Sequence, residues 1–588
     1  MKIKSLLKQA ELQNKTVCRR DSGESRLFGC RRCKAKAETL RQKDREIIYL
    51  YDIFLFVFFG GTDFSVSFLF FFRRKKNMTQ FLEKLTEYNN AVNGVVWGAF
   101  GLALLIGTGI LITALTKFFQ VTHLSLWWKN TIGSLFNKDV IGHSQDKKSI
   151  SPFQALCTAL AATIGVGNIA GVAAAIATGG PGAVFWMWLA AFFGMMTNYG
   201  ENVLGLYYRR RNAEGEWSGG AMYYLRDGLG SIKGCKTLGK VLAVIFCLFT
   251  LLASFGIGAM GQINKIVVNV ESAFSNAAMS SLEVFEGVSL YSVILGAVLV
   301  IIAALITLGG LKRIASFAEK IVPFMVVLFV TGSIILIICK YNMILPAFGA
   351  IFSNAFNIKA VAGGTLGAFI ATVVQQGFKR GVFSNEAGLG SSVMVHCNSN
   401  IKEPVKQGMW GIFEVFADTM IVCTITALVV LTSGLYDFKA LSLVEGVTDA
   451  TLVATAFDSI FSFGIGFGSK FVAIAIALFA FTTVLGWDHY GSKAWEYLFG
   501  TKTTKVYKVI HLVTIFLGAV LTSSLAWDIS DTFNGLMMIP NLIAVVVLSG
   551  LVCKITKNYV DRVVKGKDVA PMLSALPEVQ AELEKIED

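Results

Sequence analysis

One apolar stretch, residues 151–182, limits the possible folds more than any other part of the chain. It reads SPFQALCTALAATIGVGNIAGVAAAIATGGPG and exceeds the roughly 20 residues that a helix needs to cross a bilayer. Its middle, Thr163 to Asn168, holds two glycines and an asparagine, which are poor residues for an unbroken helix. The stretch therefore indicates a broken membrane helix. The alternative is an unbroken helix in which Gly167 and Gly171 allow close packing.

A break at this depth has a chemical use. Backbone that leaves the helix within lipid must be buried in protein or line a cavity. The freed carbonyl oxygens can then hold a cation, and the N-terminus of the second half-helix presents N–H groups to an anion. This arrangement is typical of the binding sites of ion-coupled transporters.

The composition also indicates a polytopic membrane protein. Of the 588 residues, 54% are hydrophobic and 16% are charged, whereas a soluble domain carries about 25% charged residues. The net charge of +14 is concentrated in residues 1–77, which hold 18 Lys and Arg against 8 Asp and Glu. The remaining chain carries only +4, so the charge gives no reason to expect a nucleic-acid partner. A single CxxC, Cys30 and Cys33, does not predict a zinc site.

Residues 1–77 differ from the rest of the chain. A basic segment, 1–46, precedes a phenylalanine-rich run, 47–72, and a second basic cluster, 73–76. The run could be an additional transmembrane helix, although basic residues on both flanks give it no orientation. We favour the interpretation that residues 1–77 are not part of the native protein and that translation starts at Met78. Codons for Arg73 and Arg74 can resemble a bacterial ribosome-binding site just upstream of it.

From Met78 onwards, apolar spans follow one another at regular intervals. The shorter amphipathic segments 118–136 and 451–467 are expected to lie at the membrane interface or to re-enter the membrane. Eleven transmembrane helices are expected, at 92–116, 153–178, 181–207, 239–266, 288–308, 314–339, 363–395, 408–433, 469–489, 506–526 and 530–553.

The loops between these spans alternate in charge. Acidic residues mark the intervening loops 271–286, 437–458 and 528–531, and basic loops stay in the cytoplasm. We therefore expect a multi-pass protein of the cell membrane, bacterial inner or plasma membrane, with residue 78 outside and the C-terminus in the cytoplasm. The basic loops are 117–150, 208–238, 312–313, 402–406, 493–505 and the start of the tail at 554–557.

The order of the spans predicts an internal repeat. After an extra transmembrane helix and an interfacial helix in 78–150, two sets of five spans follow, 151–340 and 341–553, before a cytoplasmic tail, 554–588. The sixth of these ten spans, within 363–397, is interrupted by Gln375-Gln376-Gly377 and by polar residues down to Ser392. Broken helices at corresponding positions, running in opposite directions, mark an inverted-repeat transporter. The alternative is two ordinary kinked helices.

Several motifs, in order, resemble the alanine/glycine:cation symporter family, also called sodium:alanine symporters. They are ATIGVGNIAGVA (162–173), GGPGAVFWMW (179–188), GGAMYYLRDGLG (219–230), RGVFSNEAGLGSS (380–392) and FTTVLGW (481–487). The resemblance covers Met78 to about Val560. It implies an all-α membrane protein with one N-terminal helix and a 5+5 inverted-repeat, leucine-transporter-like core.

The resemblance also implies the activity. We expect a secondary active symporter that imports a small neutral amino acid, alanine or glycine, by alternating access. Sodium is expected as the coupling ion and no other cofactor is expected. The alternative is a sodium- or proton-coupled carrier of glutamine or another neutral amino acid.

The resemblance further implies the residues that bind the substrate. Backbone N–H groups near Gly167 and Asn168 would receive the carboxylate, and freed carbonyls at a break near Gly377 would take the ammonium group. Trp487 would close the side-chain pocket, with an interfacial belt tryptophan as the alternative. The expected substrate-binding residues are Thr163, Gly165, Gly167, Asn168, Gln262, Gly377, Thr483 and Trp487.

Two further sets of residues are expected to act beside the substrate. Carbonyl oxygens of Ala161 and Ile164 and the hydroxyls of Thr482 and Thr483 would hold sodium, a hard cation that prefers oxygen ligands. Asn385 and Glu386 are expected at an inner gate, since a carboxylate at membrane depth is expensive and therefore a functional candidate. In that role Glu386 would pair with Lys379 or Arg380. Glu201 and Asp418, also within spans, are either proton or ion sites or structural hydrogen-bond partners.

Other classes of function lack their signatures. No HExxH, GxSxG or GxxxxGK[ST] motif is present, which argues against a membrane enzyme or an ATP-driven pump. No repeated filter loop that would indicate a channel is visible. The sequence therefore predicts a transporter and not an enzyme.

Overall fold

The computed structural model describes residues 75–136, 148–274, 282–285, 288–356, 366–438, 440–448, 451–460, 466–521 and 524–585. The chain divides into two units, Met1–Gln80 and Phe81–Asp588, and the second contains all the described helices except the first turns of the N-terminal one. Residues 1–74 lie outside the described part, so the origin proposed for residues 1–77 stays a prediction.

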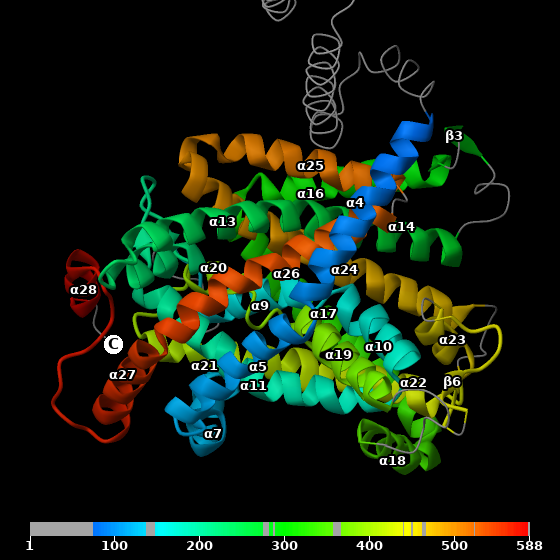
Figure 1. The fold of residues 1–588 in the computed structure, drawn as a ribbon, viewed down its shortest axis with the longest axis horizontal. Helices are drawn as coiled ribbons and strands as arrows, with labels where there is room; N and C mark the ends of the chain where they lie inside the picture. Colours follow the sequence, from blue (N-terminus) through cyan, green and yellow to red (C-terminus); the bar gives the residue numbers. More distant parts are fainter. Residues whose placement is uncertain are drawn as a thin grey trace, which may run out of the picture. The chain divides into compact units, whose positions relative to one another are not determined.

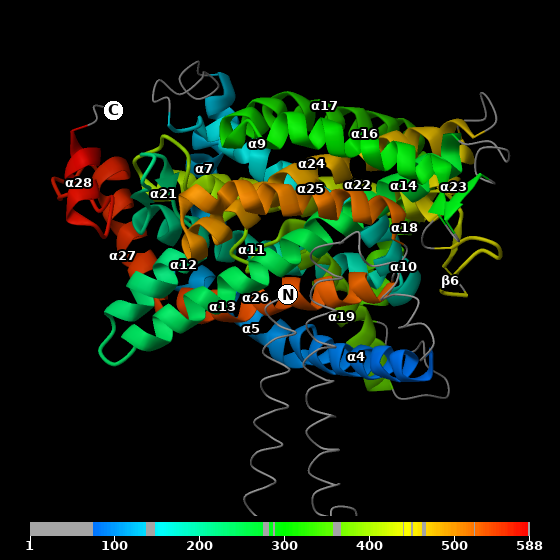
Figure 2. The same ribbon diagram turned by 90° about the horizontal axis from the view of Figure 1, so that it is seen from above.

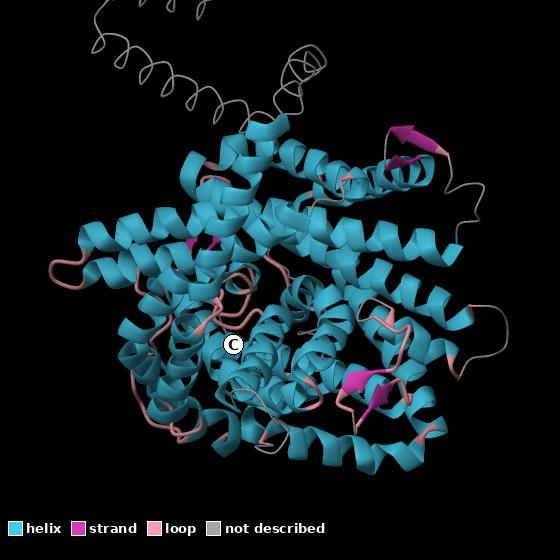
Figure 3. Cartoon of the chain, turned by 45° about the vertical axis from the view of Figure 1, so that its right-hand side comes forward, coloured by secondary structure: helices cyan, strands magenta, loops and turns pink. Residues whose placement is uncertain are grey.

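Helices make up most of the described chain (Figures 1 and 3). The long ones are α4 (Lys75–Val96), α5 (Ala99–Leu115), α11 (Gly182–Tyr207), α13 (Lys236–Phe255), α14 (Gly261–Phe274), α16 (Leu290–Thr307), α17 (Gly310–Cys339), α19 (Leu366–Asn385), α24 (Phe467–Phe499), α25 (Thr504–Val520) and α26 (Ser524–Val547). The shorter ones are α6 (Phe119–Thr122), α7 (Leu124–Asn130), α9 (Pro152–Thr163), α10 (Val172–Gly179), α12 (Ala221–Tyr223), α18 (Ile344–Ala355), α20 (Val393–His396), α21 (Pro404–Val415), α22 (Thr424–Thr432), α23 (Leu452–Asp458), α27 (Ser549–Tyr559) and α28 (Pro577–Glu584).

Several helices contain or adjoin π-helical turns, which occur often at functional sites. These are η2 (Gly167–Gly171), η3 (Tyr224–Gly228), η5 (Gly256–Met260), η7 (Phe416–Cys423) and η9 (Val560–Val564). Single 3-10 turns are η1 (Ile132–Phe136), η4 (Leu229–Ser231), η6 (Tyr341–Met343) and η8 (Thr501–Thr503). Three antiparallel hairpins lie in loops: β1 (Arg210–Arg211) with β2 (Trp217–Ser218), β3 (Glu283–Phe285) with β4 (Val288–Ser289), and β5 (Tyr436–Asp437) with β6 (Ser442–Leu443).

The number of apolar spans is lower than the eleven predicted. Within the described residues, eight helices are long and apolar enough to cross a membrane, or nine when the bent pair of α9 with η2 and α10 counts as one. Helices also occupy the two other predicted ranges, as α11 and α19. Both carry polar residues that lower their mean hydropathy, such as Asn198 and Glu201 in α11 and Gln375 and Lys379 in α19. Eleven spans are therefore not confirmed, although the helices are present.

The bundle is built around α24, which is the most buried of the candidate spans. It packs against α9, α13, α14, α17 and α23, which come from widely separated parts of the sequence. The helices α16 and α17 are the least buried spans, and Figure 2 shows them on one side of the bundle with α5 on the other. A large apolar surface remains on these outer helices, as expected for helices that face lipid.

A C-terminal segment folds back onto the β1–β2 hairpin. Trp217 of β2 packs with Leu573, Val579 and Leu583 in a small separate apolar cluster. The backbone N–H of Ala575 donates to the carbonyl oxygen of Tyr207 at 2.8 Å. Arg211 forms an ion pair with Glu582 at 2.9 Å and lies over the ring of Trp217. We call this segment, residues 573–583, the docked tail.

Candidate functional site

The predicted break in the first broken helix is confirmed. Helix α9 ends at Thr163, Ile164 adopts an extended conformation, and a π-helical turn begins at Gly167. The two halves meet at an angle of 53°. The N–H group of Gly165, left without a helical partner, donates to the side-chain oxygen of Asn168 at 2.9 Å. This hydrogen bond satisfies part of the backbone that the break exposes.

The break in the second broken helix lies in the later part of the interruption predicted from Gln375 to Ser392, and not at Gly377. Helix α19 continues without interruption through Gly377 to Asn385, and the unwound segment is 386–392. Glu386, Gly388 and Gly390 in this segment have positive φ angles, which no helix accommodates. The expected break at Gly377, with carbonyls open to an ammonium group, is therefore wrong.

Gly377 instead permits close packing of two helices. A Cβ atom at this position would lie 2.5 Å from the carbonyl oxygen of Ala183 and 2.5 Å from the Cβ of Trp186, both on α11. The adjacent Gln375 side chain donates to the carbonyl oxygen of Trp97 at 3.0 Å. Polar and small residues in α19 thus serve contacts with neighbouring helices, and the helix stays intact.

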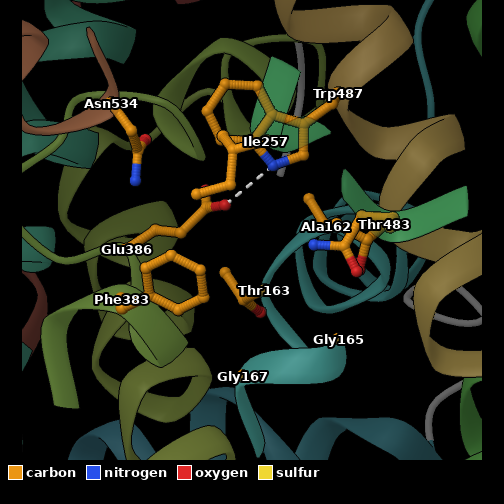
Figure 4. Close-up of a pocket in the computed structure, with 11 residues that line it drawn as sticks. Ala162, Thr163, Gly165, Gly167, Ile257, Phe383, Glu386, Thr483, Trp487 and Asn534 are labelled. Atoms are coloured by element: carbon orange, nitrogen blue, oxygen red, sulfur yellow. Dashed lines mark hydrogen bonds between the residues drawn. The ribbon is translucent and has the colours of Figure 1, made fainter. Parts of the chain in front are cut away.

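The two breaks face each other across a small cavity. A Cβ atom at Gly167 would lie 3.2 Å from the ring of Phe383 on α19, so the half-helices are in close contact. The cavity has a volume of about 20 Å³, which holds a water-sized group. Figure 4 shows Trp487 and Glu386 above it, with Gly165 and Gly167 below. It is lined by Ala162, Thr163, Gly165, Gly167, Ile257, Gln262, Phe383, Glu386, Thr483, Trp487 and Asn534.

Two amide oxygens in this lining have no hydrogen-bond partner among the described residues. They are Oε1 of Gln262 on α14 and Oδ1 of Asn534 on α26, and the two residues are 4% and 3% exposed. Buried polar atoms in native proteins nearly always have a partner. Two unpaired acceptors in one cavity make it suited to a ligand that donates hydrogen bonds.

Trp487 is a buried wall of the cavity and not an exposed belt residue. Its indole N–H donates to Glu386 Oε1 at 3.1 Å (Figure 4), and its ring packs edge-on against Tyr490. Gly258 in η5 lets the indole approach closely, since a Cβ there would lie 2.6 Å from Trp487 Cβ. The predicted pocket wall thus lies where it can contact a ligand.

Glu386 has partners other than those predicted. One carboxylate oxygen accepts from Trp487, and the other accepts from the hydroxyl of Ser391 at 2.5 Å. The expected pairing with Lys379 is wrong, because Lys379 Nζ lies 3.0 Å from Asp531 Oδ2. No ion pair joins Glu386 to Arg380 in the part of the chain that the structure describes.

Asn168 and Asn385 point away from the cavity. The Asn168 amide donates to Asp418 Oδ1 in η7 at 2.6 Å. The Asn385 amide donates to the hydroxyl of Thr419, also in η7, at 3.0 Å. Asp418 also accepts from Ser384 at 2.8 Å, so η7 is tied to both broken helices. These contacts support the structural interpretation of Asp418 and place Asn168 behind the break.

The two threonines predicted to hold sodium point in different directions. Thr483 lines the cavity, and a Cβ atom at Gly165 would lie 2.6 Å from its hydroxyl oxygen. Thr482 does not line it; its hydroxyl donates to the Phe479 carbonyl at 2.9 Å and lies 3.5 Å from Met325 Sδ. Ala161 and Ile164, buried at the end of α9, also lie outside the lining. Helix α24 nevertheless packs directly on this end of α9, because a Cβ at Gly486 would lie 2.5 Å from Ala162 Cβ.

The family of the chain follows from its similarity to known proteins. Residues 82–572 match the model of the sodium:alanine symporter family. The chain belongs to the sodium:alanine symporter family. It is therefore a multi-pass membrane transporter, a cation-coupled amino-acid symporter, and not an enzyme.

Relatives within the sodium:alanine symporter family differ in the substrates that their names give. The chain is 44% identical to the sodium/alanine symporter AgcS of Methanococcus maripaludis, over 80% of this chain and 96% of that protein. It is 35% identical to the probable sodium/glutamine symporter GlnT of Bacillus subtilis, over 84% and 93%. Among solved structures, MhsT in complex with L-phenylalanine matches 70% of this chain and 98% of that one, with a TM-score of 0.43 and 13% identity.

Sequence reasoning missed part of this symporter's cavity. Three lining residues that were not predicted lie in three different helical segments: Ile257, Phe383 and Asn534. Only Phe383 falls within a quoted family motif. A signal for Asn534 exists in retrospect, because it is an amide in an otherwise largely apolar span. Seven of the predicted residues do line the cavity: Thr163, Gly165, Gly167, Gln262, Glu386, Thr483 and Trp487.

Proposed function

We propose that this symporter imports a small neutral amino acid, alanine or glycine, together with sodium. The observation that carries the proposal is the small cavity between two broken helices, closed by Trp487. The bulky indole of Trp487 in the cavity lining would restrict the space for the substrate side chain and so favours a small one. The sodium/alanine symporter AgcS, at 44% identity, is a relative whose name gives the same substrate.

The cavity offers complementary groups to a zwitterion. N–H groups at the start of η2, around Gly167, would receive the carboxylate, since a helix N-terminus attracts anions. The unpaired oxygens of Gln262 and Asn534 would accept from the ammonium group, in the role first expected of Gly377. The substrate side chain would then face Trp487.

Sodium would bind between α9 and α24. The proposed ligands are the carbonyl oxygens of Ala161 and Ile164 with the hydroxyls of Thr482 and Thr483. The close packing of α24 on the end of α9 supports this placement. Asn385 and Glu386 would form the inner gate, with Glu386 acting through Trp487 and Ser391.

We further propose eleven transmembrane helices: one N-terminal helix and a 5+5 inverted repeat whose first and sixth members are the broken helices. Their order in the chain, with α9, η2 and α10 opening one set and α19 and α20 opening the other, supports the repeat. The charge alternation of the loops supports a C-terminus in the cytoplasm of a bacterial or archaeal cell.

Uptake into proteoliposomes tests the function. Radiolabelled alanine should accumulate against its gradient when an inward sodium gradient is imposed, and should only equilibrate without one. In a competition panel, unlabelled alanine and glycine should inhibit most strongly. Strongest inhibition by glutamine would support the alternative substrate, which the relative GlnT represents. Accumulation that ignores sodium would refute the proposed coupling.

The orientation can be checked with reporter fusions. A reporter of membrane sidedness fused after residue 220, in a basic loop, should show that this site lies in the cytoplasm. The same reporter fused within the 440–448 loop should show that this site lies outside the cell. Reversal at both sites would contradict the proposed topology.

The sodium site can be checked by removing two of its oxygen ligands. Thr482→Val with Thr483→Val should raise the half-saturating sodium concentration by about tenfold, which is a loss of about 1.4 kcal/mol. Thr426→Val is the matched control, since its buried hydroxyl only donates to the carbonyl oxygen of Val422 in the adjoining turn η7. Unchanged sodium dependence in the double variant would place the cation elsewhere.

A further inference from the structure

A buried aspartate–histidine pair lies behind the cavity. Asp488 follows Trp487 directly on α24, and His511 lies on the neighbouring helix α25. Asp488 is 1% exposed and His511 is fully buried, and neither lines the cavity. Their closest atoms, Asp488 Oδ1 and His511 Nδ1, are 3.5 Å apart.

The side-chain polar atoms of this pair have no hydrogen-bond partner among the described residues. Both carboxylate oxygens of Asp488 and both ring nitrogens of His511 are unpaired within the described part of the chain. Burying a single unpaired charge is strongly unfavourable, and ionisable residues within membrane helices usually have a functional reason. Hydrogen bonding therefore does not explain why both groups are buried here.

The pair is connected to the cavity through Tyr507. The Tyr507 ring stacks on His511, with ring centroids 5.7 Å apart. Its hydroxyl donates to Ser254 at 3.1 Å and lies 3.5 Å from the carbonyl oxygen of Trp487. The Tyr507 side chain therefore connects the pair to the backbone of Trp487, which forms the cavity wall.

Other titratable groups lie on the helices of the pair and on the elements packed against them. Lys508, on the same helix as His511, donates to the carbonyl oxygen of Thr307 on α16 at 2.5 Å. The packed segment η5 has no titratable side chain, and α13 contributes the hydroxyl of Ser254. The remaining titratable groups on the elements around α25 are Lys236, Lys240 and Cys247 (α13), Lys265 and Glu271 (α14), Tyr291 (α16), Lys470, His489, Tyr490, Lys493, Glu496 and Tyr497 (α24), Lys502 (η8) and Lys505 (α25).

We propose that Asp488 and His511 form one proton-binding site that gains and loses a proton during the transport cycle. With one proton the pair is neutral overall, either as carboxylate with imidazolium or as carboxylic acid with imidazole. After release, a single carboxylate charge remains, so the proton belongs to the pair and not to one residue. A metal cation is a poorer occupant, because hard cations such as Ca²⁺ and Mg²⁺ take about six or more oxygen ligands and the pair offers two.

The proton site is a proposal beyond sodium coupling. It rests on the proposed function only because the test uses alanine as the transported substrate. The full-length protein is reconstituted with a pH-sensitive dye inside the vesicles, equal sodium on both sides and the membrane potential clamped at zero. Adding external alanine should acidify the lumen in the wild-type protein. Asp488→Asn and His511→Gln should each abolish this acidification. His489→Gln, one residue away with its Nε2 3.3 Å from the amide of Asn398, is the matched control and should retain it.

Radiolabelled alanine uptake in the same vesicles separates the two proposals. Alanine uptake without acidification in the wild-type protein would overturn the proton site and leave the sodium symport intact. Acidification at the wild-type rate in both Asp488→Asn and His511→Gln would also overturn the proton site. Sodium-independent uptake with alanine-dependent acidification would refute sodium coupling and support the proton site. The wild-type measurement decides the matter even where a variant does not fold.

Discussion

Replacing Trp487 by alanine should change which amino acids the symporter accepts. The indole closes the cavity and is held by the hydrogen bond to Glu386 at 3.1 Å, so its removal leaves a large space beside the substrate. One methylene in an apolar pocket changes binding by about 1–3 kcal/mol, or roughly 10–200-fold. We therefore expect alanine uptake to weaken by roughly 10-fold or more while larger neutral amino acids become better competitors. A competition panel against radiolabelled alanine measures both effects.

Two further variants identify the cause. Trp487→Phe keeps an aromatic wall but removes the N–H donor to Glu386, so it should weaken transport and largely keep the order of preference. Trp495→Ala removes another tryptophan from the same helix, whose N–H donates to Thr503 at 3.0 Å, and should leave the order unchanged. An unaltered competition profile in Trp487→Ala would show that the pocket is misplaced.

A methyl group added at Gly165 should abolish most transport of every substrate alike. Its carbon would lie 2.6 Å from the hydroxyl oxygen of Thr483 and 3.6 Å from Gln262 Oε1, within the cavity between the proposed ligands. Overpacking of this kind typically costs about 1–3 kcal/mol, which corresponds to roughly 5–150-fold in affinity. Gly165→Ala should therefore lower uptake of alanine and glycine together, with their ranking kept.

The matched control for this prediction is Gly171→Ala. Gly171 ends the π-helical turn that follows the break, and a Cβ atom there meets no atom within 4 Å outside its own helix. The Gly171→Ala variant should transport alanine and glycine as the wild-type protein does. Normal uptake by Gly165→Ala, at the same amount of folded protein in size-exclusion chromatography, would mean that substrate binds elsewhere.

The first break could be predicted because its cause is local. Glycine and asparagine within an apolar span disfavour a helix wherever the span packs, and the break is found between Thr163 and Gly167. The second break could be predicted only in part. The polar residues around Gly377 find distant partners such as Trp97, so the helix survives there. The break lies in the later part of the predicted interruption, where Glu386, Gly388 and Gly390 have positive φ angles.

Side-chain partners were beyond prediction for a similar reason. Lys379 pairs with Asp531, which is remote in the sequence, and not with the nearby Glu386. Asn534 and Asn541 are both amides on α26, yet the former lines the cavity while the latter donates to the carbonyl oxygen of Gly388. Only the packing of helices decides between two such residues. The charge pattern and the motifs could therefore predict which helices form the site, but only part of the residues within it.

The docked tail has a consequence for how the protein is made. Arg211 and Glu582 are 371 positions apart, so the apolar face around Trp217 stays uncovered while all the helices between them are synthesised. Domains and membrane helices assemble in the order of synthesis, and exposed apolar surface marks an unfinished chain for chaperones and proteases. Closure of the tail over Trp217 is thus a late step of biogenesis.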